Sequence, residues 1–298
     1  MFEFFANIFG YLLQIMYNVV NNYGLAIILF SVLVKVLLIP LSVKQQKTMK
    51  KSAELQEKLK IIQFKYKNDQ EKLNQEMMNL YKEEKMNPFS GCIVAIVQML
   101  LLISVLFLVR SPLTYMQKIS KDDLNRYVEQ LKEDEIEVSS VYPEIDLIRE
   151  YDVLKEKNPE DDNINKINLQ MDFLGLDLSK IPQQNMSDYT VYIIPILYII
   201  SSFISIRLST SMQEKMSKQS KNNVIDGETG KELTVKKEEN EVDTVMQTNK
   251  MMSWMLPIMS ISIAFVAPLG LALYWLVNNV LMIVERLILN KITISEEE

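Results

Sequence analysis

The amino-acid sequence predicts an all-α integral membrane protein with five transmembrane helices, an N-terminal interfacial helix and a cytoplasmic helical hairpin. The first observation behind this fold class is that the chain is 48% hydrophobic, although its mean hydropathy is only +0.04. Apolar and charged residues must therefore occupy separate blocks, as they do in membrane proteins. The second observation is a long charged stretch that has no glycine or proline and consists mostly of helix-forming residues.

The first 22 residues predict an amphipathic helix that lies in the membrane interface. Its apolar residues recur at spacings of three and four, the period of one helix face. They are Phe2, Phe5, Phe9, Leu12 and Met16. Asn18, Asn21 and Asn22 then interrupt the apolar run. The alternative is that residues 1–22 form the first part of a longer spanning helix.

Five apolar stretches follow, and we interpret each as a membrane span. They occupy residues 24–41, 93–109, 191–206, 254–267 and 271–289. Pro268 and Gly270 predict a tight turn between the fourth span and the fifth. At ~1.5 Å per residue, the shorter spans cover roughly 21 to 27 Å, which is less than the ~30 Å hydrocarbon core. Either these bounds are too narrow or the bilayer is thin around the protein.

Charges in the connecting segments predict the orientation. Residues 44–91 hold 11 lysines and 7 acidic residues, whereas residues 110–188 hold 10 basic and 18 acidic residues. Residues 207–221 add four basic residues and one acidic residue. Basic loops remain on the cytoplasmic side. We therefore expect 44–91 and the flexible loop 207–250 in the cytoplasm, the acidic loop 110–188 and the N-terminus outside, and the tail 290–298 inside.

Residues 46–85 predict the two antiparallel helices of the hairpin. They are rich in Lys, Glu, Gln, Leu and Met, which are all good helix formers. Apolar residues recur at helical spacing in each half, namely Leu55, Leu59 and Ile62, and then Leu73, Met77 and Leu80. Residues 66–69 between them predict a turn, with Asn68 or Asp69 as the cap of the second helix.

The composition leaves out the most common catalytic and metal sites. The chain has no histidine and one cysteine, Cys92. The usual zinc and haem ligand sets, the Ser–His and Cys–His pairs and an intrachain disulfide therefore cannot form. No glycine-rich phosphate-binding loop occurs either. These absences do not by themselves exclude an enzyme. Together with the family resemblance given below, they lead us to expect a protein that is not an enzyme, with no catalytic residue, no metal, no cofactor and no direct contact with nucleic acid.

Lys35 is the most informative residue, because it lies within the first span, about six residues from its inner end. A lysine there can extend to the cytoplasmic surface. It can also line a water-filled cavity between the helices, and Ser31 lies one turn away on the same face. Both interpretations of Lys35 are open at the level of the sequence.

Polar residues in other spans form matching stripes. The second span contains Gln98. The third carries Tyr198, Ser201, Ser202 and Ser205, and the fifth carries Tyr274, Asn278 and Glu285 on one face, with Trp275 beside them. Small hydroxyl residues often serve only helix packing, and we favour that reading for the serines. A lysine, a glutamine and an asparagine in three different spans are harder to explain by packing, and together they predict one polar groove.

Four long stretches resemble the YidC family of membrane protein insertases, relatives of the mitochondrial Oxa-type insertases, in its Gram-positive-like five-span form. These stretches are NYGLAIILFSVLVKVLLIPLSVKQQKTMKK, KYKNDQEKLNQEMMNLYKEEKMNPFSGC, MDFLGLDLSKIP and PLGLALYWLVNNVLMIVE. The resemblance covers most of the chain apart from the middle of the acidic loop and the second cytoplasmic loop. The short acidic tail SEEE differs from the long basic tails of some members, and the lipoprotein cysteine of many Gram-positive members is missing.

The resemblance implies a hydrophilic groove that is open to the cytoplasm and the lipid but closed outside. Its centre is a basic residue of the first span, usually arginine, at the position of Lys35. The groove positions matched by motif are Gln98, Tyr274, Trp275 and Asn278, and we place Ser31 beside them. Nascent membrane proteins are the implied substrates. Further expected partners are the ribosome or targeting factors, the Sec translocon and membrane lipids.

Such a groove would bring water and a positive charge partway into the bilayer, which lowers the cost of moving a polar tail across hydrocarbon. Two other functions fit part of the sequence. A small-solute or ion transporter would use Lys35, but no repeated half is visible. A non-catalytic assembly scaffold would need the hairpin but not Lys35.

Overall fold

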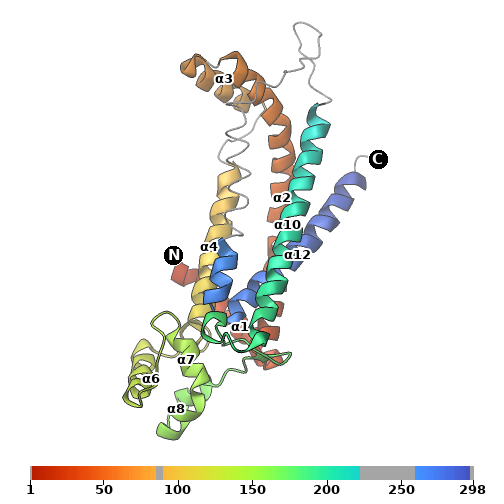
Figure 1. Ribbon diagram of the computed structural model, residues 1–298. Coiled ribbons are helices and arrows are strands. Elements are labelled where there is room, and N and C mark those ends of the chain that lie inside the picture. The colour runs from red at the N-terminus through yellow and green to blue at the C-terminus, as the bar shows by residue number, and fades with distance from the viewer. Residues whose placement is uncertain (1, 67, 85–89, 222–258, 296–298) are drawn as a thin grey trace. The chain divides into compact units, whose positions relative to one another are not determined.

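The computed structural model describes residues 2–66, 68–84, 90–221 and 259–295, and most of them are helical (Figure 1). The chain divides into two compact units, which are described separately below. Unit 1 comprises Met1–Leu37, Val97–Ser202 and Ser260–Ile288, and unit 2 comprises Leu38–Ile96, Phe203–Met259 and Leu289–Glu298.

Three helices are long and apolar enough to cross a membrane. They are α2 (Tyr23–Lys65), α10 (Ile193–Lys221) and α12 (Leu269–Ser295). Their apolar segments are Tyr23–Thr48, Tyr189–Ser211, which includes the turn before α10, and Leu269–Ile288. Only 28%, 39% and 28% of the most apolar windows of these segments are buried in protein. Most of this apolar surface therefore needs another apolar environment, which a bilayer supplies.

For the other two predicted spans, the structure describes only some of the residues or side chains. The second falls in α4 (Ser90–Arg110), where Met99–Arg110 is a shorter apolar helix. Residues 254–258 of the fourth lie outside the described residues, and residues 259–266 are helical. The count of five spans thus remains a prediction. The cytoplasmic loop predicted for 207–250 begins later than expected, because α10 continues to Lys221, and its remainder lies outside the described residues.

In unit 1, α1 (Phe2–Val20) packs one face against the core. The buried positions are Ala6, Phe9, Gly10, Leu13 and Tyr17. Gly10 lies against α5 (Pro112–Tyr115), so closely that a β-carbon at this position would be 2.0 Å from the carbonyl oxygen of Tyr115. Glycine is thus required at the contact between the two helices, for reasons of space.

The predicted acidic loop is a folded part of unit 1. After α5 it contains α6 (Lys121–Glu133), α7 (Pro143–Arg149), α8 (Tyr151–Lys157), α9 (Asp162–Ile167), a hairpin of β1 (Asp172–Phe173) and β2 (Leu176–Asp177), and the 3-10 turns η1 (Pro182–Gln184) and η2 (Tyr189–Tyr192). Leu131, Leu147 and Leu154 are fully buried here. An apolar core therefore holds the segment together despite its net negative charge.

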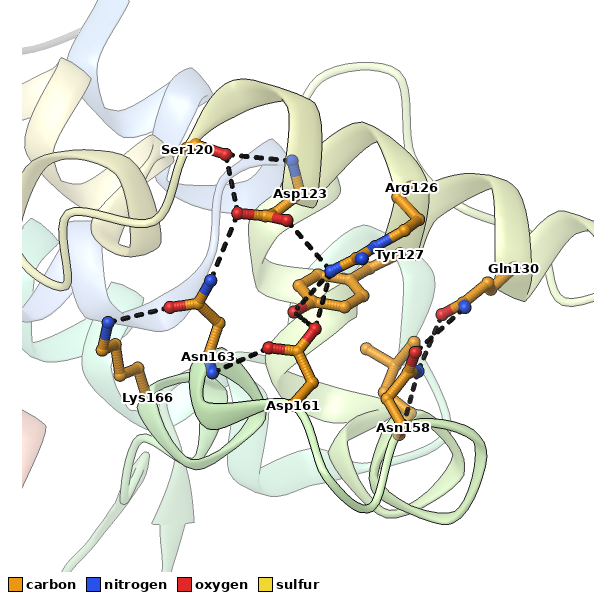
Figure 2. Close-up of polar contacts among 10 residues, drawn as sticks. Ser120, Asp123, Arg126, Tyr127, Gln130, Asn158, Asp161, Asn163 and Lys166 are labelled. Atoms are coloured by element: carbon orange, nitrogen blue, oxygen red, sulfur yellow. Dashed lines mark hydrogen bonds and ion pairs between the residues drawn. The ribbon is translucent and has the colours of Figure 1, made fainter.

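Polar contacts join α6 to the chain around α9, as Figure 2 shows. Asp161 caps α9 through the backbone N–H of Asn163, and its carboxylate accepts hydrogen bonds from Arg126 at 2.6 Å and from the Tyr127 hydroxyl at 2.7 Å. Burial, followed by the bond to Asp161, raises the pKa of Tyr127 to about 12. The same hydroxyl lowers the pKa of Asp161. The network therefore keeps its tyrosine protonated and its aspartate ionised at neutral pH.

Residues 170–180, which include the β hairpin, bind the first residues of both α2 and α12. The backbone N–H of Tyr23 donates to Gln170 at 2.9 Å, and those of Leu269 and Gly270 donate to Lys180 and Leu178 at 2.9 and 3.0 Å. These N–H groups lack partners within their own helices. Residues 170–180, which we call the strap, therefore accept hydrogen bonds from the first residues of both helices. As a result, α2 and α12 begin at the same end of unit 1 and run in the same direction.

In unit 2, the later part of α2 is followed by α3 (Gln70–Glu83). Asp69, one of the two predicted caps, accepts a hydrogen bond from the backbone N–H of Lys72 at 3.1 Å. Lys58 of α2 forms an ion pair with Glu84 at the end of α3. Leu55 and Leu80 are buried. The end of α3 therefore lies beside Lys58 of α2, which is on the other side of the turn in the sequence.

Candidate functional site

Lys35 forms an ion pair with Glu285 inside unit 1. Its Nζ lies 2.5 Å from Oε2 of Glu285, which joins α2 to α12. The exposed fractions of the two side chains are 22% and 14%, so both are largely covered by protein. Neighbouring Val36 and Val284 are exposed apolar residues on the same two helices. The charged pair thus lies between helices whose outward surfaces are suited to lipid.

The pair lies within the apolar portions of both helices. At ~1.5 Å per residue, Lys35 lies roughly 18 Å along α2 from Tyr23, inside the portion Tyr23–Thr48, and Glu285 lies inside Leu269–Ile288. Ser31 lies one turn earlier, is 1% exposed, and its Oγ has no hydrogen-bond partner among the described residues. Oε1 of Glu285 is likewise buried without a partner there. The pair and this serine leave polar atoms available inside an otherwise apolar region.

The predicted residues of α12 make contacts of other kinds. The Asn278 amide donates to the backbone oxygen of Tyr274 at 2.8 Å, within the helix. Trp275 is buried, and its ring lies 5.6 Å from the ring of Tyr198 on α10. Among the described side chains, no hydrogen bond or ion pair joins Lys35 to these three residues. The structure therefore brings Lys35 together with Glu285 rather than with the full predicted set.

Gln98 belongs to the same predicted set, and it is part of α4. Its side chain lies outside the described residues. Its place in a groove therefore stays a prediction.

Asn279 is a contact residue that was missing from the predicted site. Its Nδ2 donates to Oγ of Ser202 at 2.7 Å and lies 3.3 Å from Oγ of Ser201, so it links α12 to α10. Ser201 in turn donates to the backbone oxygen of Tyr198. Two of the four polar residues of the third-span stripe thus act in helix packing, as favoured above for the serines. The stripe itself was the available signal, because buried hydroxyls on one face require a partner on the facing helix.

A cavity of about 540 Å³ lies elsewhere in unit 1, between α1, the end of α4, α6 and α7. Arg110, Lys121, Lys132 and Glu144 are among its lining residues, and none of the predicted groove residues lines it. Burial raises the pKa of Glu144, although hydrogen bonds from Thr114 oppose the shift. Because this carboxylate accepts bonds from the N–H and hydroxyl of Thr114 at 3.0 and 2.6 Å, we assign it a structural role at the start of α5.

Comparison with known proteins places the chain in a family. Residues 15–297 match the family model described as 60Kd inner membrane protein. Proteins called membrane protein insertase YidC from Francisella tularensis subsp. novicida strain U112, subsp. holarctica strain LVS and subsp. tularensis strain SCHU S4 are each 42% identical to it over 104 residues. The aligned part is 35% of this chain and 19% of each relative's length. With its three long apolar helices, the protein is a multi-pass protein of the bacterial plasma membrane. Because the family match extends over nearly the whole chain, it belongs to the 60Kd inner membrane protein family, which is the YidC/Oxa family.

Proposed function

We propose that this protein is an insertase, which assists nascent membrane proteins as they enter and fold in the bilayer. The observation that carries the proposal is the ion pair of Lys35 with Glu285, which lies within the apolar portions of two helices long enough to cross a membrane. A charge at this depth is costly, and its presence marks a functional path. Family membership and the names of the relatives favour this function over a transporter or a scaffold.

The proposed substrate path is a hydrophilic groove that includes Lys35 and the other predicted residues. These are Ser31, Gln98, Tyr274, Trp275 and Asn278. An acidic client tail would pair transiently with the lysine, because an opposite charge reduces the cost of leaving water. The apolar client segment would then move along α10 and α12 into lipid. Partitioning of that segment supplies the free energy, so no chemical reaction and no nucleotide is needed.

The proposed topology has five spans, with α1 in the outer interface and the N-terminus outside. The segment 110–188 would lie outside, and the hairpin 44–91 and the C-terminus would lie in the cytoplasm. The charge asymmetry of the loops supports this orientation. So does the strap, because a folded segment that binds the starts of α2 and α12 belongs on one side of the membrane.

Cysteine labelling of intact cells tests this topology. In a Cys92→Ser background, a membrane-impermeant thiol reagent should modify Asp152→Cys but not Gln70→Cys. Both positions are exposed in the structure, so reactivity reports the side of the membrane. Permeabilised cells provide the control, in which both positions should react. Labelling of position 70 but not of position 152 in intact cells would reverse the proposed orientation.

The hairpin is proposed to contact the ribosome or targeting factors, and the helices α2 and α12 to contact clients, with or without the Sec translocon. Lipids would cover the exposed apolar residues. A photocrosslinking residue at Val36, exposed on α2 beside Lys35, should capture nascent membrane proteins during synthesis. The same residue at Gln75, exposed on α3, should capture ribosomal or targeting proteins instead.

The matched control for both positions is Tyr11, which is 60% exposed on α1. A crosslinker there should capture neither class of protein. If Val36 gave no more nascent-chain product than Tyr11, the insertase proposal would fail. If Gln75 gave no more ribosomal or targeting product than Tyr11, only the proposed role of the hairpin would fail.

A further inference from the structure

The cation of the proposed client path already has a partner in this structure. Oε2 of Glu285 lies 2.5 Å from Nζ of Lys35, and both side chains are largely covered by protein. The other carboxylate oxygen of Glu285 is buried and has no hydrogen-bond partner among the described residues. The ion pair with Lys35 therefore holds this carboxylate across the two helices, next to the charge of the adjacent Arg286.

This arrangement changes the energetics of client binding. An unpaired lysine at this depth would carry a large desolvation cost, which an adjacent carboxylate reduces. A client that brings its own carboxylate must first displace Glu285. The exchange replaces one carboxylate by another, so the charge of the pair and the type of contact are conserved. A client with an uncharged tail does not compete for Lys35 and leaves the ion pair intact.

We propose that Glu285 is a resident counter-ion that competes with client carboxylates for Lys35 and thereby limits the preference for acidic client tails. The inference rests on the proposed insertase function and deepens it. In the resting protein Glu285 keeps Lys35 paired, and during insertion it releases the lysine to the client. Its specificity role depends on its charge, whereas its shape alone would suffice for packing.

A purely structural ion pair is the competing explanation. Buried ion pairs contribute little net stability compared with well-packed apolar residues. Moreover, other contacts already hold the helices of unit 1, since the strap binds the starts of α2 and α12 and Asn279 links α12 to α10. A structural pair would affect all clients equally, whatever the charge of their tails. A competing counter-ion affects the ratio between clients.

The test measures insertion into proteoliposomes of two clients that differ only in an acidic or an amide-containing tail. It compares Lys35→Arg with the double variant Lys35→Arg/Glu285→Gln. Arginine stays charged after its partner is removed, whereas a buried lysine can lose its proton. Glutamine keeps nearly the shape of glutamate without its charge. Removal of the competitor should raise the ratio of acidic-tail to amide-tail insertion by about tenfold.

Asp134→Asn is the matched control, because Asp134 also lies 2.5 Å from a lysine, Lys157, but in the segment outside the spans. It should leave the ratio unchanged. A ratio that stays constant or falls on Glu285→Gln overturns the counter-ion proposal, even where both clients insert less. Failure of the unaltered protein to insert either client above the level of empty liposomes would instead overturn the insertase function itself. Thermal unfolding of each purified variant establishes that the proteins compared are folded.

Discussion

Replacing Lys35 by glutamate should reduce insertion of an acidic-tail client more than any other single change in the proposed groove. The substitution places a second carboxylate opposite Glu285 and removes the cation that a client tail would use. We expect a reduction of about a hundredfold for Lys35→Glu and about tenfold for Lys35→Ala, while Lys35→Arg retains insertion because the positive charge is kept. For a client with an uncharged tail the same series should show a smaller spread.

Complementation of a strain depleted of the protein measures these effects, with one client of each kind. Lys155→Ala is the control, since Lys155 is an exposed residue of α8 far along the chain from the predicted site. If Lys35 served only to reach the membrane surface, Lys35→Ala would be nearly silent, because other lysines follow on the cytoplasmic side. Equal insertion of the acidic client by the unaltered protein and by Lys35→Glu would rule out the groove-charge mechanism, and the family assignment would stand.

The second large effect is expected at Gly10, on stability rather than on the client path. A β-carbon there would lie 2.0 Å from the carbonyl oxygen of Tyr115 and 2.5 Å from its carbonyl carbon. Both are backbone atoms, so no side chain can rotate out of the way. Gly10→Ala should therefore force α1 away from α5 and lower the free energy of unfolding by about 1–3 kcal/mol. Gly10→Val should cost more than Gly10→Ala.

Equilibrium unfolding of the purified protein in detergent gives the measurement. Asn18→Ala is the matched control, because Asn18 is exposed on the same helix and its replacement should change stability by no more than about 0.5 kcal/mol. Loss of the α1 contact should also expose the N-terminal residues to protease at a lower denaturant concentration. A Gly10→Ala protein as stable as the unaltered one would show that α1 is not held against α5 as described.

Sequence reasoning was sufficient where the signal is local. The apolar portions of α2, α10 and α12 follow from hydropathy, and Asp69 was one of two cap candidates because short polar side chains accept hydrogen bonds at helix starts. Lys35 stood out because a charge inside an apolar run is expensive wherever the helix packs. Each of these statements depends on a residue and its neighbours in sequence.

Other features were beyond that reasoning. The predicted flexible loop began too early, because helix formers continue α10 to Lys221. The interior of segment 110–188 was not readable, because leucines such as Leu131 and Leu154 are spread thinly among charged residues and meet only when short helices pack together. The requirement for glycine at position 10 could not be predicted from the sequence, because it arises from the carbonyl of Tyr115, more than a hundred residues away.

The sequence by itself determined that this protein has membrane-spanning helices, that its charges are segregated by loop, and that Lys35 is an isolated cation in an apolar stretch. Only the tertiary structure decided which partner that cation has, which is Glu285 on another helix. Likewise, the residue that donates to the third-span serines is Asn279 and not Asn278, whose amide donates within its own helix. The physical reason is rotation: hydropathy tells which helices meet lipid, but adjacent residues of a helix point about 100° apart, so the partner of each polar group is set by how the helices pack.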